Sequence, residues 1–342
     1  MARDSSGEKY LILKEMGETI DMTFGRVHVA SGEVDWFFRP HNISDGVGAF
    51  TDLLNNDGNQ ITEQPLMKAE AIPNFFSRLR LLFQHLKNMR KQEYDWRHRD
   101  TRQRGVGTSL AYIRFDKAAT QALLDHSRTV KCSLNSVMLR LLNEVAIDNL
   151  LNSTPTETVW TIPLNLRGGA TSGNASSNFT ASISLRLPPA PTDTYIHEKI
   201  RTIYAQGVHW GAWLLSNMTR YVGKTAFRYL AEHAKPCWLG VFSNVGAWPP
   251  AGYEHPIDDD ITYMGAPPVT SLLPVTACSM TWNQRMTLTL QLHSSISKDI
   301  GDTETMVQQW ATKLAALANL TSDQYVIAVV PWSTVSAQTK EF

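Results

Sequence analysis

Residues 40–46 read Pro40-His41-Asn42-Ile43-Ser44-Asp45-Gly46, a histidine followed by three spacer residues, an aspartate and a glycine. An apolar run typical of a strand, residues 34–38, precedes this stretch, and the apolar side chains of residues 47–54 follow it with helical spacing. The sequence therefore predicts His41 at a turn between a strand and a helix, at an edge that a ligand can reach. Because the unperturbed pKa of histidine lies near neutrality, this side chain can take a proton from a hydroxyl or an amine at cellular pH.

The segment before His41 favours a β-hairpin. Residues 21–30 and 34–39 have the composition of strands, and they flank the turn-forming residues Ser31, Gly32 and Glu33. Gly46 begins the helix that follows, and the polar residues 55–58 end it. The hairpin is thus predicted to deliver His41 at the end of its second strand.

Length and charge narrow the class of protein. A chain of 342 residues with 43% hydrophobic content can bury a large core, in one domain or in two lobes. The 32 basic and 32 acidic residues balance, so no net field favours nucleic acid or an anionic membrane as a partner. No apolar run approaches the roughly 18 residues needed to span a bilayer, and the first residues lack the pattern of a signal peptide.

The cysteines indicate a reducing compartment. Cys132, Cys237 and Cys278 lie far apart and are odd in number, so we predict reduced thiols in the core and a cytoplasmic protein. Paired cysteines and the His-x-x-x-His and His-Glu-x-x-His spacings are absent, so the sequence proposes no metal site.

Strands and helices alternate along the remainder of the chain, which is typical of an α/β fold with mixed sheets. Ser133 is predicted to cap a long helix over residues 134–151. A helical region over residues 197–231 is predicted to break near its middle, at Gly207 and Gly211. The other predicted elements are strands at residues 110–115, 160–166, 179–187, 237–242, 275–282 and 286–293, helices at residues 117–127 and 304–318, and a small polar loop at residues 171–178. The last two strands are predicted to form a hairpin around Asn283 and Gln284.

Two basic segments each leave two interpretations open. In residues 72–91 the apolar side chains form a helical stripe with arginines and lysines around it. This helix could lie on a membrane surface, but we prefer the commoner arrangement, in which the stripe packs on the protein itself. Residues 96–107 carry four arginines that could receive the phosphates of a nucleotide-bearing carrier at a tunnel mouth, although a solvated loop is the simpler interpretation.

These motifs, in this order, resemble those of the CoA-dependent acyltransferase superfamily. That group includes chloramphenicol acetyltransferase, the condensation domains of nonribosomal peptide synthetases, the plant BAHD acyltransferases and the wax ester synthases, and the likeness is closest to the wax-ester and alcohol acyltransferase branch. It rests on the HxxxDG motif at residues 41–46, the helix after Ser133, the strand at residues 162–167, the asparagine-containing loop before residues 185–188, the stretch at residues 243–246 and the hairpin at residues 267–293.

The resemblance implies an α/β fold of two lobes, a chloramphenicol-acetyltransferase-like sandwich with mixed sheets and a tunnel between the lobes. His41 would lie near the middle of that tunnel. Many members carry HHxxxDG, and Pro40 stands here in place of the first histidine. In full-length members the motif also lies much farther along the chain. The resemblance therefore implies a reduced N-terminal lobe at residues 1–104 and a C-terminal lobe at residues 105–342.

The resemblance makes His41 the general base that deprotonates an acceptor, which then attacks an acyl thioester directly. By its spacing alone, Asp45 could orient His41 or cap the helix beginning at Gly46. The resemblance implies instead that Asp45 turns away and pairs with an arginine, with Arg167 favoured over Arg186. Gly46 would permit a close approach to the histidine or the donor, or would simply begin the helix.

Ser243 and Asn244 are predicted at the end of a strand, in a turn that faces the tunnel. They could donate hydrogen bonds to the carrier arm of the donor or to a tetrahedral oxyanion, or they could only stabilise the turn. Asn178 is a weaker candidate for the same site.

The implied reaction is acyl transfer from acyl-CoA, or from a carrier-protein thioester, to an alcohol, with an amine as second choice. No tightly bound cofactor is expected, since acyl-CoA or a phosphopantetheine thioester is a co-substrate. The expected partners are a small-molecule acceptor and, as an option, an acyl carrier protein. Two alternatives stay open: a catalytically silent condensation-like binding or scaffold protein, and a histidine-dependent cyclase or hydrolase on the same fold.

Overall fold

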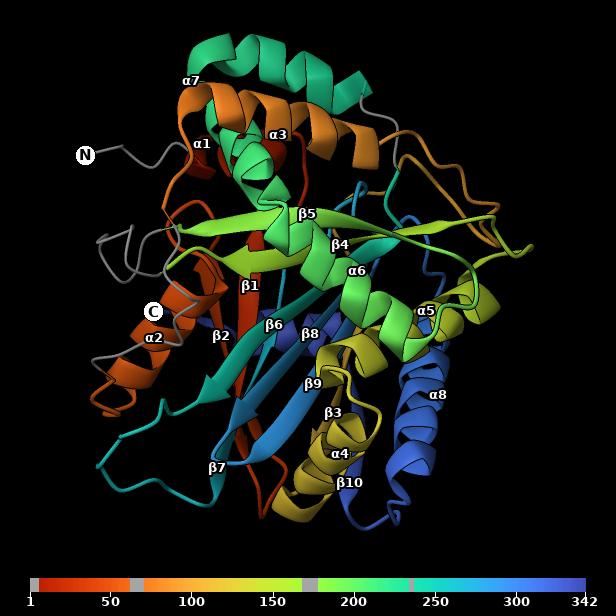
Figure 1. Ribbon diagram of the computed structural model, residues 1–342. Helices are drawn as coiled ribbons and strands as arrows, with labels where there is room; N and C mark the ends of the chain where they lie inside the picture. The colour runs from red at the N-terminus through yellow and green to blue at the C-terminus, as the bar shows by residue number, and fades with distance from the viewer. Residues whose placement is uncertain (1–5, 62–70, 168–177, 234–236) are drawn as a thin grey trace.

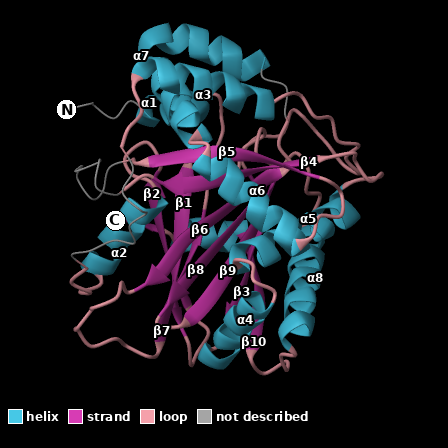
Figure 2. Ribbon diagram, in the orientation of Figure 1, coloured by secondary structure: helices cyan, strands magenta, loops and turns pink. Residues whose placement is uncertain are grey.

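The computed structural model describes residues 6–61, 71–167, 178–233 and 237–342, and most of the predicted loop at residues 171–178 lies outside these ranges. Over the described residues the strands form two mixed sheets that face each other, with helices on the outer sides (Figures 1 and 2). The α/β fold with mixed sheets is confirmed.

The smaller sheet has the strand order β11-β2-β1-β7. β1 (Asp21–His28) and β2 (Val34–Pro40) form the predicted antiparallel hairpin, and Gly32 takes the positive φ of 76° that its turn requires. The other edge of β1 pairs with β7 (Ile261–Ala266), while β11 (Lys340–Glu341) runs parallel to β2. The predicted boundary between residues 104 and 105 stays a prediction.

The larger sheet has the order β10-β3-β9-β8-β6-β4-β5. Its β8–β9 hairpin turns at Asn283 and Gln284, as predicted, and both residues have positive φ. The strands are β3 (Val106–Phe115), β4 (Thr158–Asn165), β5 (Thr180–Leu187), β6 (Gly240–Trp248), β8 (Val275–Trp282), β9 (Arg285–His293) and β10 (Tyr325–Pro331).

Helices cover the larger sheet and build most of the core with it. α5 (Leu134–Leu150) begins at Ser133, whose side chain caps it as predicted, and packs with α4 (Lys117–Thr129) and α8 (Ile300–Ala318). The short α9 (Trp332–Gln338) contacts β3 and β2. The fully buried Trp160 and Trp310 belong to this core, as do side chains of β3, β8 and β9.

The two sheets are joined through β7. The hydroxyls of Thr287 and Thr289 on β9 donate to the carbonyl oxygens of Tyr263 and Gly265 on β7, at 2.8 and 2.6 Å. A Cβ at Gly265 would lie 3.2 to 3.4 Å from side-chain atoms of Met280 and Phe24, so the glycine permits this close packing. The hairpin that ends at His41 is thereby held over the larger sheet.

A further group of helices lies together at the top of Figure 1: α1 (Ser6–Glu15), α3 (Phe75–Asn88) and α7 (Val208–His233), with α6 (Asp193–Ala205) leading into it. The helical region breaks at Gly207, as predicted, and at Gly223, both with positive φ. The predicted break at Gly211 is wrong. A Cβ on Gly211 would lie 2.3 Å from the Leu81 carbonyl carbon, so this glycine permits α3 and α7 to pack backbone against backbone.

Candidate active site

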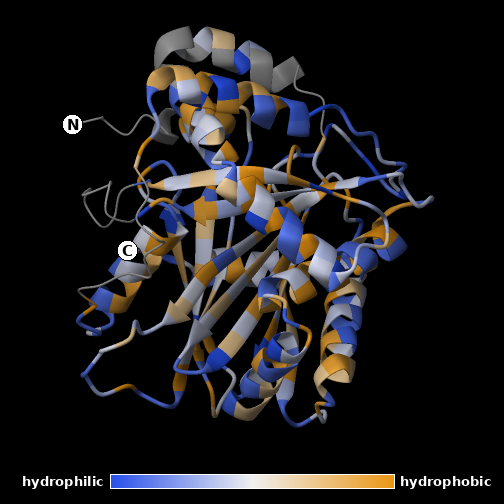
Figure 3. Cartoon of the chain, viewed as in Figure 1, coloured by the Kyte–Doolittle hydropathy of each residue, from blue (hydrophilic) through white to orange (hydrophobic). Residues whose placement is uncertain are grey.

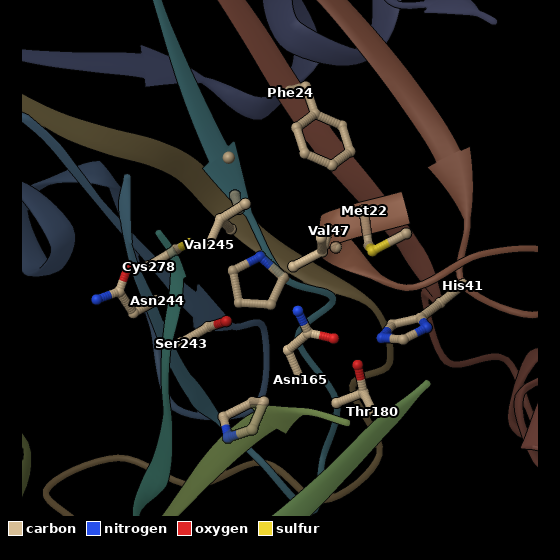
Figure 4. A pocket seen from close by; sticks show the side chains of 15 residues that line it. Met22, Phe24, His41, Val47, Asn165, Thr180, Ser243, Asn244, Val245 and Cys278 are labelled. Atoms are coloured by element: carbon tan, nitrogen blue, oxygen red, sulfur yellow. The ribbon is translucent and has the colours of Figure 1, made fainter. Parts of the chain in front are cut away.

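His41 lies directly after β2, and two hydrogen bonds hold its own backbone groups. Its N–H donates to the carbonyl of Ile20 at 3.3 Å, and its own carbonyl accepts a short hydrogen bond from the side-chain amide of Asn178. The half-buried imidazole points into a cavity, toward Asn165 and Thr180 (Figure 4). The strand–turn–helix context predicted for His41 is confirmed by β2 and α2 (Gly46–Asn56).

Asp45 is fully buried and both its carboxylate oxygens are engaged. Oδ1 accepts from the N–H of Gly48 at 2.9 Å, which caps α2. Oδ2 accepts from Arg167 Nη1 at 2.8 Å, from the N–H of Phe179 at 2.7 Å and from the Thr180 hydroxyl at 3.0 Å. The carboxylate therefore ties together the start of α2, the end of β4 and the start of β5.

Arg167 is the partner of Asp45 that the sequence favoured, and this pair is buried on both sides. The guanidinium also donates to Asn165 Oδ1 at 3.2 Å and lies over the ring of Phe179. Arg186, the other candidate, lies elsewhere and pairs with Glu157 at 3.1 Å. Since Asp45 is saturated by these donors, its contribution is to hold the loop that carries His41, rather than to orient the imidazole.

The pKa of His41 falls to about 4, chiefly because burial disfavours the charged ring and secondly because the Lys9 ammonium repels it. The charge of Asp45 and backbone groups of His41 and Ser44 oppose this shift only in part. At neutral pH the imidazole is therefore uncharged, which is the state that a general base requires.

Tyr10 on α1 covers the imidazole from one side. The two rings are stacked with their centroids 4.1 Å apart and their planes 15° apart, and the phenol oxygen lies 3.2 Å from His41 Nε2. The Tyr10 hydroxyl therefore already lies within hydrogen-bonding distance of one nitrogen of the His41 ring.

Two cavities adjoin at this site, and His41 lines one of them. The first has a volume of about 80 Å³ and is bounded by His41, Gly46 and Met22 together with residues of β4 to β8. The second, about 270 Å³, extends toward the start of α5 and is bounded by Ser133 and Asn135. The two cavities share a wall made of Val47, Pro163, Asn165, Asn244 and Val245.

Ser243 and Asn244 both line the first cavity, but the prediction that they end a strand in a turn is wrong. They lie inside β6, where the pairing with β8 shifts register between Asn244 and Gly246. The side chain of Asn244 bonds to Asn135 Oδ1 and to the N–H of Gly246, at 2.8 and 2.7 Å. The irregularity therefore lies where β6 borders the two cavities.

Three residues at the site were missed as candidates by the sequence analysis: Tyr10, Asn165 and Thr180. Asn165 lies two positions before Arg167, and Thr180 lies two positions after Asn178. Because residues two positions apart along a strand point to the same face, Asn165 could have been placed beside Arg167, and Thr180 beside Asn178. The arginines of residues 96–107 line neither cavity, and Arg102, for example, pairs with Asp100.

Comparison with known proteins identifies the fold. No family model and no curated protein sequence matches the chain. Among solved structures, the nonribosomal peptide synthetase FmoA3 matches 84% of this chain with a TM-score of 0.57 and 12% identity. The cyclization-docking bidomain of EpoB from Sorangium cellulosum matches 83% with a TM-score of 0.55 and 11% identity, and the epimerization domain of tyrocidine synthetase B matches 82% with 0.50 and 11%.

This is the condensation-domain fold. The resemblance drawn from the sequence is confirmed at the level of the fold. The chain spans 32% of the FmoA3 chain, 60% of the EpoB bidomain and 68% of the epimerization domain. No helix among the described residues is long and apolar enough to cross a membrane, and the three cysteines are free and buried as predicted.

Proposed function

We propose that this condensation-like protein is an acyltransferase, which moves an acyl group from acyl-CoA or a carrier-protein thioester to a small alcohol, with an amine as second choice. The proposal rests on His41, an uncharged imidazole that points into a cavity from a loop fixed by Asp45 and Arg167. The free, buried cysteines are compatible with a cytoplasmic location.

In the proposed reaction, His41 removes the proton from the acceptor hydroxyl while the hydroxyl oxygen attacks the thioester carbonyl. The tetrahedral intermediate collapses when the carbon–sulfur bond breaks, and the leaving thiolate takes the proton from the imidazolium. The acyl group passes directly to the acceptor, so no protein side chain becomes acylated. The hydroxyl of Ser243 lines the same cavity and is our candidate donor to the oxyanion.

Because the larger cavity shares five lining residues with the cavity that holds His41, we assign one reactant to each cavity. The larger cavity is lined largely by apolar side chains, including Leu139, Ile162 and Phe242, which suits the acyl chain or the pantetheine arm of the donor. The smaller cavity, which holds His41 itself, would receive the reacting end of the acceptor.

The test is an intact-mass screen of short and long acyl-CoAs, and of a phosphopantetheine thioester, against a panel of alcohols and amines. We expect acylated acceptor with the parent protein and with His255→Ala, which removes an exposed histidine outside both cavities. His41→Ala should lose most of the turnover, about 100-fold or more, because general-base catalysis contributes on this order.

The same screen separates the alternatives. Thermal stabilisation by acyl-CoA without turnover over the whole panel would favour a binding or scaffold protein. Thioester consumption without any acceptor would favour a cyclase or hydrolase. Full activity of His41→Ala would refute the proposed mechanism.

A further inference from the structure

α3 exposes its apolar stripe instead of burying it. The predicted stripe consists of Phe75, Phe76, Leu79, Leu82, Phe83 and Leu86. Of these only Leu82 is buried, while Phe76 and Phe83 are 81% and 66% exposed, and Phe75 and Leu86 are also exposed. Our preferred interpretation, that this helix packs on the protein itself, is confirmed for α3 as a whole, which packs on α7, but it is wrong for most of the apolar stripe. In Figure 3 hydrophobic and hydrophilic residues alternate along α3.

The orientation of α3 is fixed by its opposite side. Leu81 and His85 are buried, and the close approach of Leu81 to Gly211 joins α3 to α7. The Arg78 guanidinium lies over the ring of Trp213, and Gln84 bonds to Gln206 at 2.9 Å. Rotation of α3 to bury its phenylalanines would break all these contacts, so the apolar face stays directed outward.

Positive charge borders this exposed face. Residues 72–91 contain five basic residues and no acidic one, in a chain whose total charge is zero. Arg90 and Lys91 pair with Glu157 and Glu93, whereas Arg80 and Lys87 have no carboxylate partner among the residues that the structure describes. At 100° per residue, both fall beside Phe76 and Phe83 on the helix.

We propose that α3 binds the surface of an anionic lipid membrane. A helix crest with phenylalanine and leucine side chains can insert them below the headgroups, while arginine and lysine at its edge contact lipid phosphates. A protein partner is less well matched, because the rings stand on a convex helix and line none of the cavities described above. The inference does not rest on the proposed acyltransferase activity.

Flotation with lipid vesicles tests this proposal. The full chain is mixed with vesicles of phosphatidylcholine alone, or with about 30% phosphatidylserine added, at low and high salt. We expect flotation with the anionic vesicles and a weaker association in high salt. Phe76→Ser/Phe83→Ser should reduce the bound fraction about tenfold or more, because both inserted rings are lost.

Matched variants separate the two contributions and guard against a folding defect. Arg80→Gln/Lys87→Gln should lose the preference for anionic over neutral vesicles. Tyr195→Ser/Val326→Ser removes two exposed apolar groups on α6 and β10 and should bind vesicles like the parent. An unchanged melting temperature verifies that each variant is folded.

The proposal is overturned if the parent chain does not float with anionic vesicles, or if Phe76→Ser/Phe83→Ser floats equally well. It is also overturned if the parent forms a dimer that this variant dissolves while neither protein binds vesicles, since the apolar face would then be covered by a second copy.

Discussion

The ring of Tyr10 is stacked on that of His41, with the phenol oxygen 3.2 Å from Nε2. An acceptor hydroxyl that gives its proton to this nitrogen must occupy the same position. Lys9, the neighbour of Tyr10 on α1, is also the cation that helps to lower the pKa of His41. α1 therefore both occupies the proton-accepting nitrogen of His41 and lowers the pKa of this proposed base.

Removal of the Tyr10 hydroxyl should accelerate the proposed reaction. Tyr10→Phe keeps the stacked ring but deletes the competing hydrogen bond, and a neutral hydrogen bond contributes about 1 kcal/mol, so kcat/KM should rise about fivefold. Tyr10→Ala should have at least the same effect with small acceptors. The measurement is kcat/KM for one alcohol at fixed donor concentration. A fall in kcat with Tyr10→Phe would instead make the phenol a participant in the reaction.

The pH dependence of kcat/KM should reflect the lowered pKa of His41. The base acts when neutral, so activity is lost as the pH falls through the folded-state pKa of about 4, and not near the usual 6.5. Lys9→Met removes a repelling charge and should move this acidic limb to higher pH. Rates from about pH 4 to 8, with circular dichroism to verify folding, provide the check. An unshifted limb in Lys9→Met would exclude the electrostatic role.

Replacing only one member of the buried pair of Asp45 and Arg167 should destabilise the protein. Asp45→Asn or Arg167→Met leaves a buried charge without its partner, which costs about 3 kcal/mol or more in the free energy of unfolding. The double variant removes both charges and should lose less than the sum of the two single losses. Urea denaturation of all four proteins measures this coupling. Strict additivity would show that the two groups do not stabilise the loop as a pair.

His85 should make the protein less stable in mild acid. His85 lies on α3, which packs on α7, and burial lowers its pKa to about 4. Between about pH 6.5 and pH 4 this histidine is therefore protonated in the unfolded chain but neutral in the folded chain. Stability contributed by the neutral ring is present above pH 6.5 and is lost as the pH falls, by about 2 kcal/mol between about pH 7.5 and 5. Denaturation of His85→Leu should show a correspondingly smaller loss, which His255→Leu should not reproduce.

Local patterns were sufficient to predict much of the fold. The hairpin before His41, the cap at Ser133 and the turn at Asn283 depend on residues close together in the sequence, and all three are found. The pairing of Asp45 with Arg167 came from the family resemblance, because no local pattern joins residues so far apart. Cavity shapes could not be predicted, since they depend on how distant strands pack.

Other elements carried no usable local signal. In α1 the apolar residues Tyr10, Leu11, Ile12 and Leu13 are consecutive, so no face could be assigned and the contact of Tyr10 with His41 was not foreseen. The periodicity of α3 identified its apolar stripe but could not tell which side the protein covers. That was decided by Gly211, whose missing side chain lets α7 dock on the opposite side.

The pairing of β1 with β7 joins parts of the chain that are distant in sequence, with Gly25 opposite Met264. A fragment that ends at residue 104 would leave the edge of β1 without its hydrogen-bonding neighbour, and the complementary fragment would leave β7 bare. Exposed strand edges of this kind promote aggregation. The two fragments should therefore be unstable when expressed apart and should complement each other when produced in the same cell.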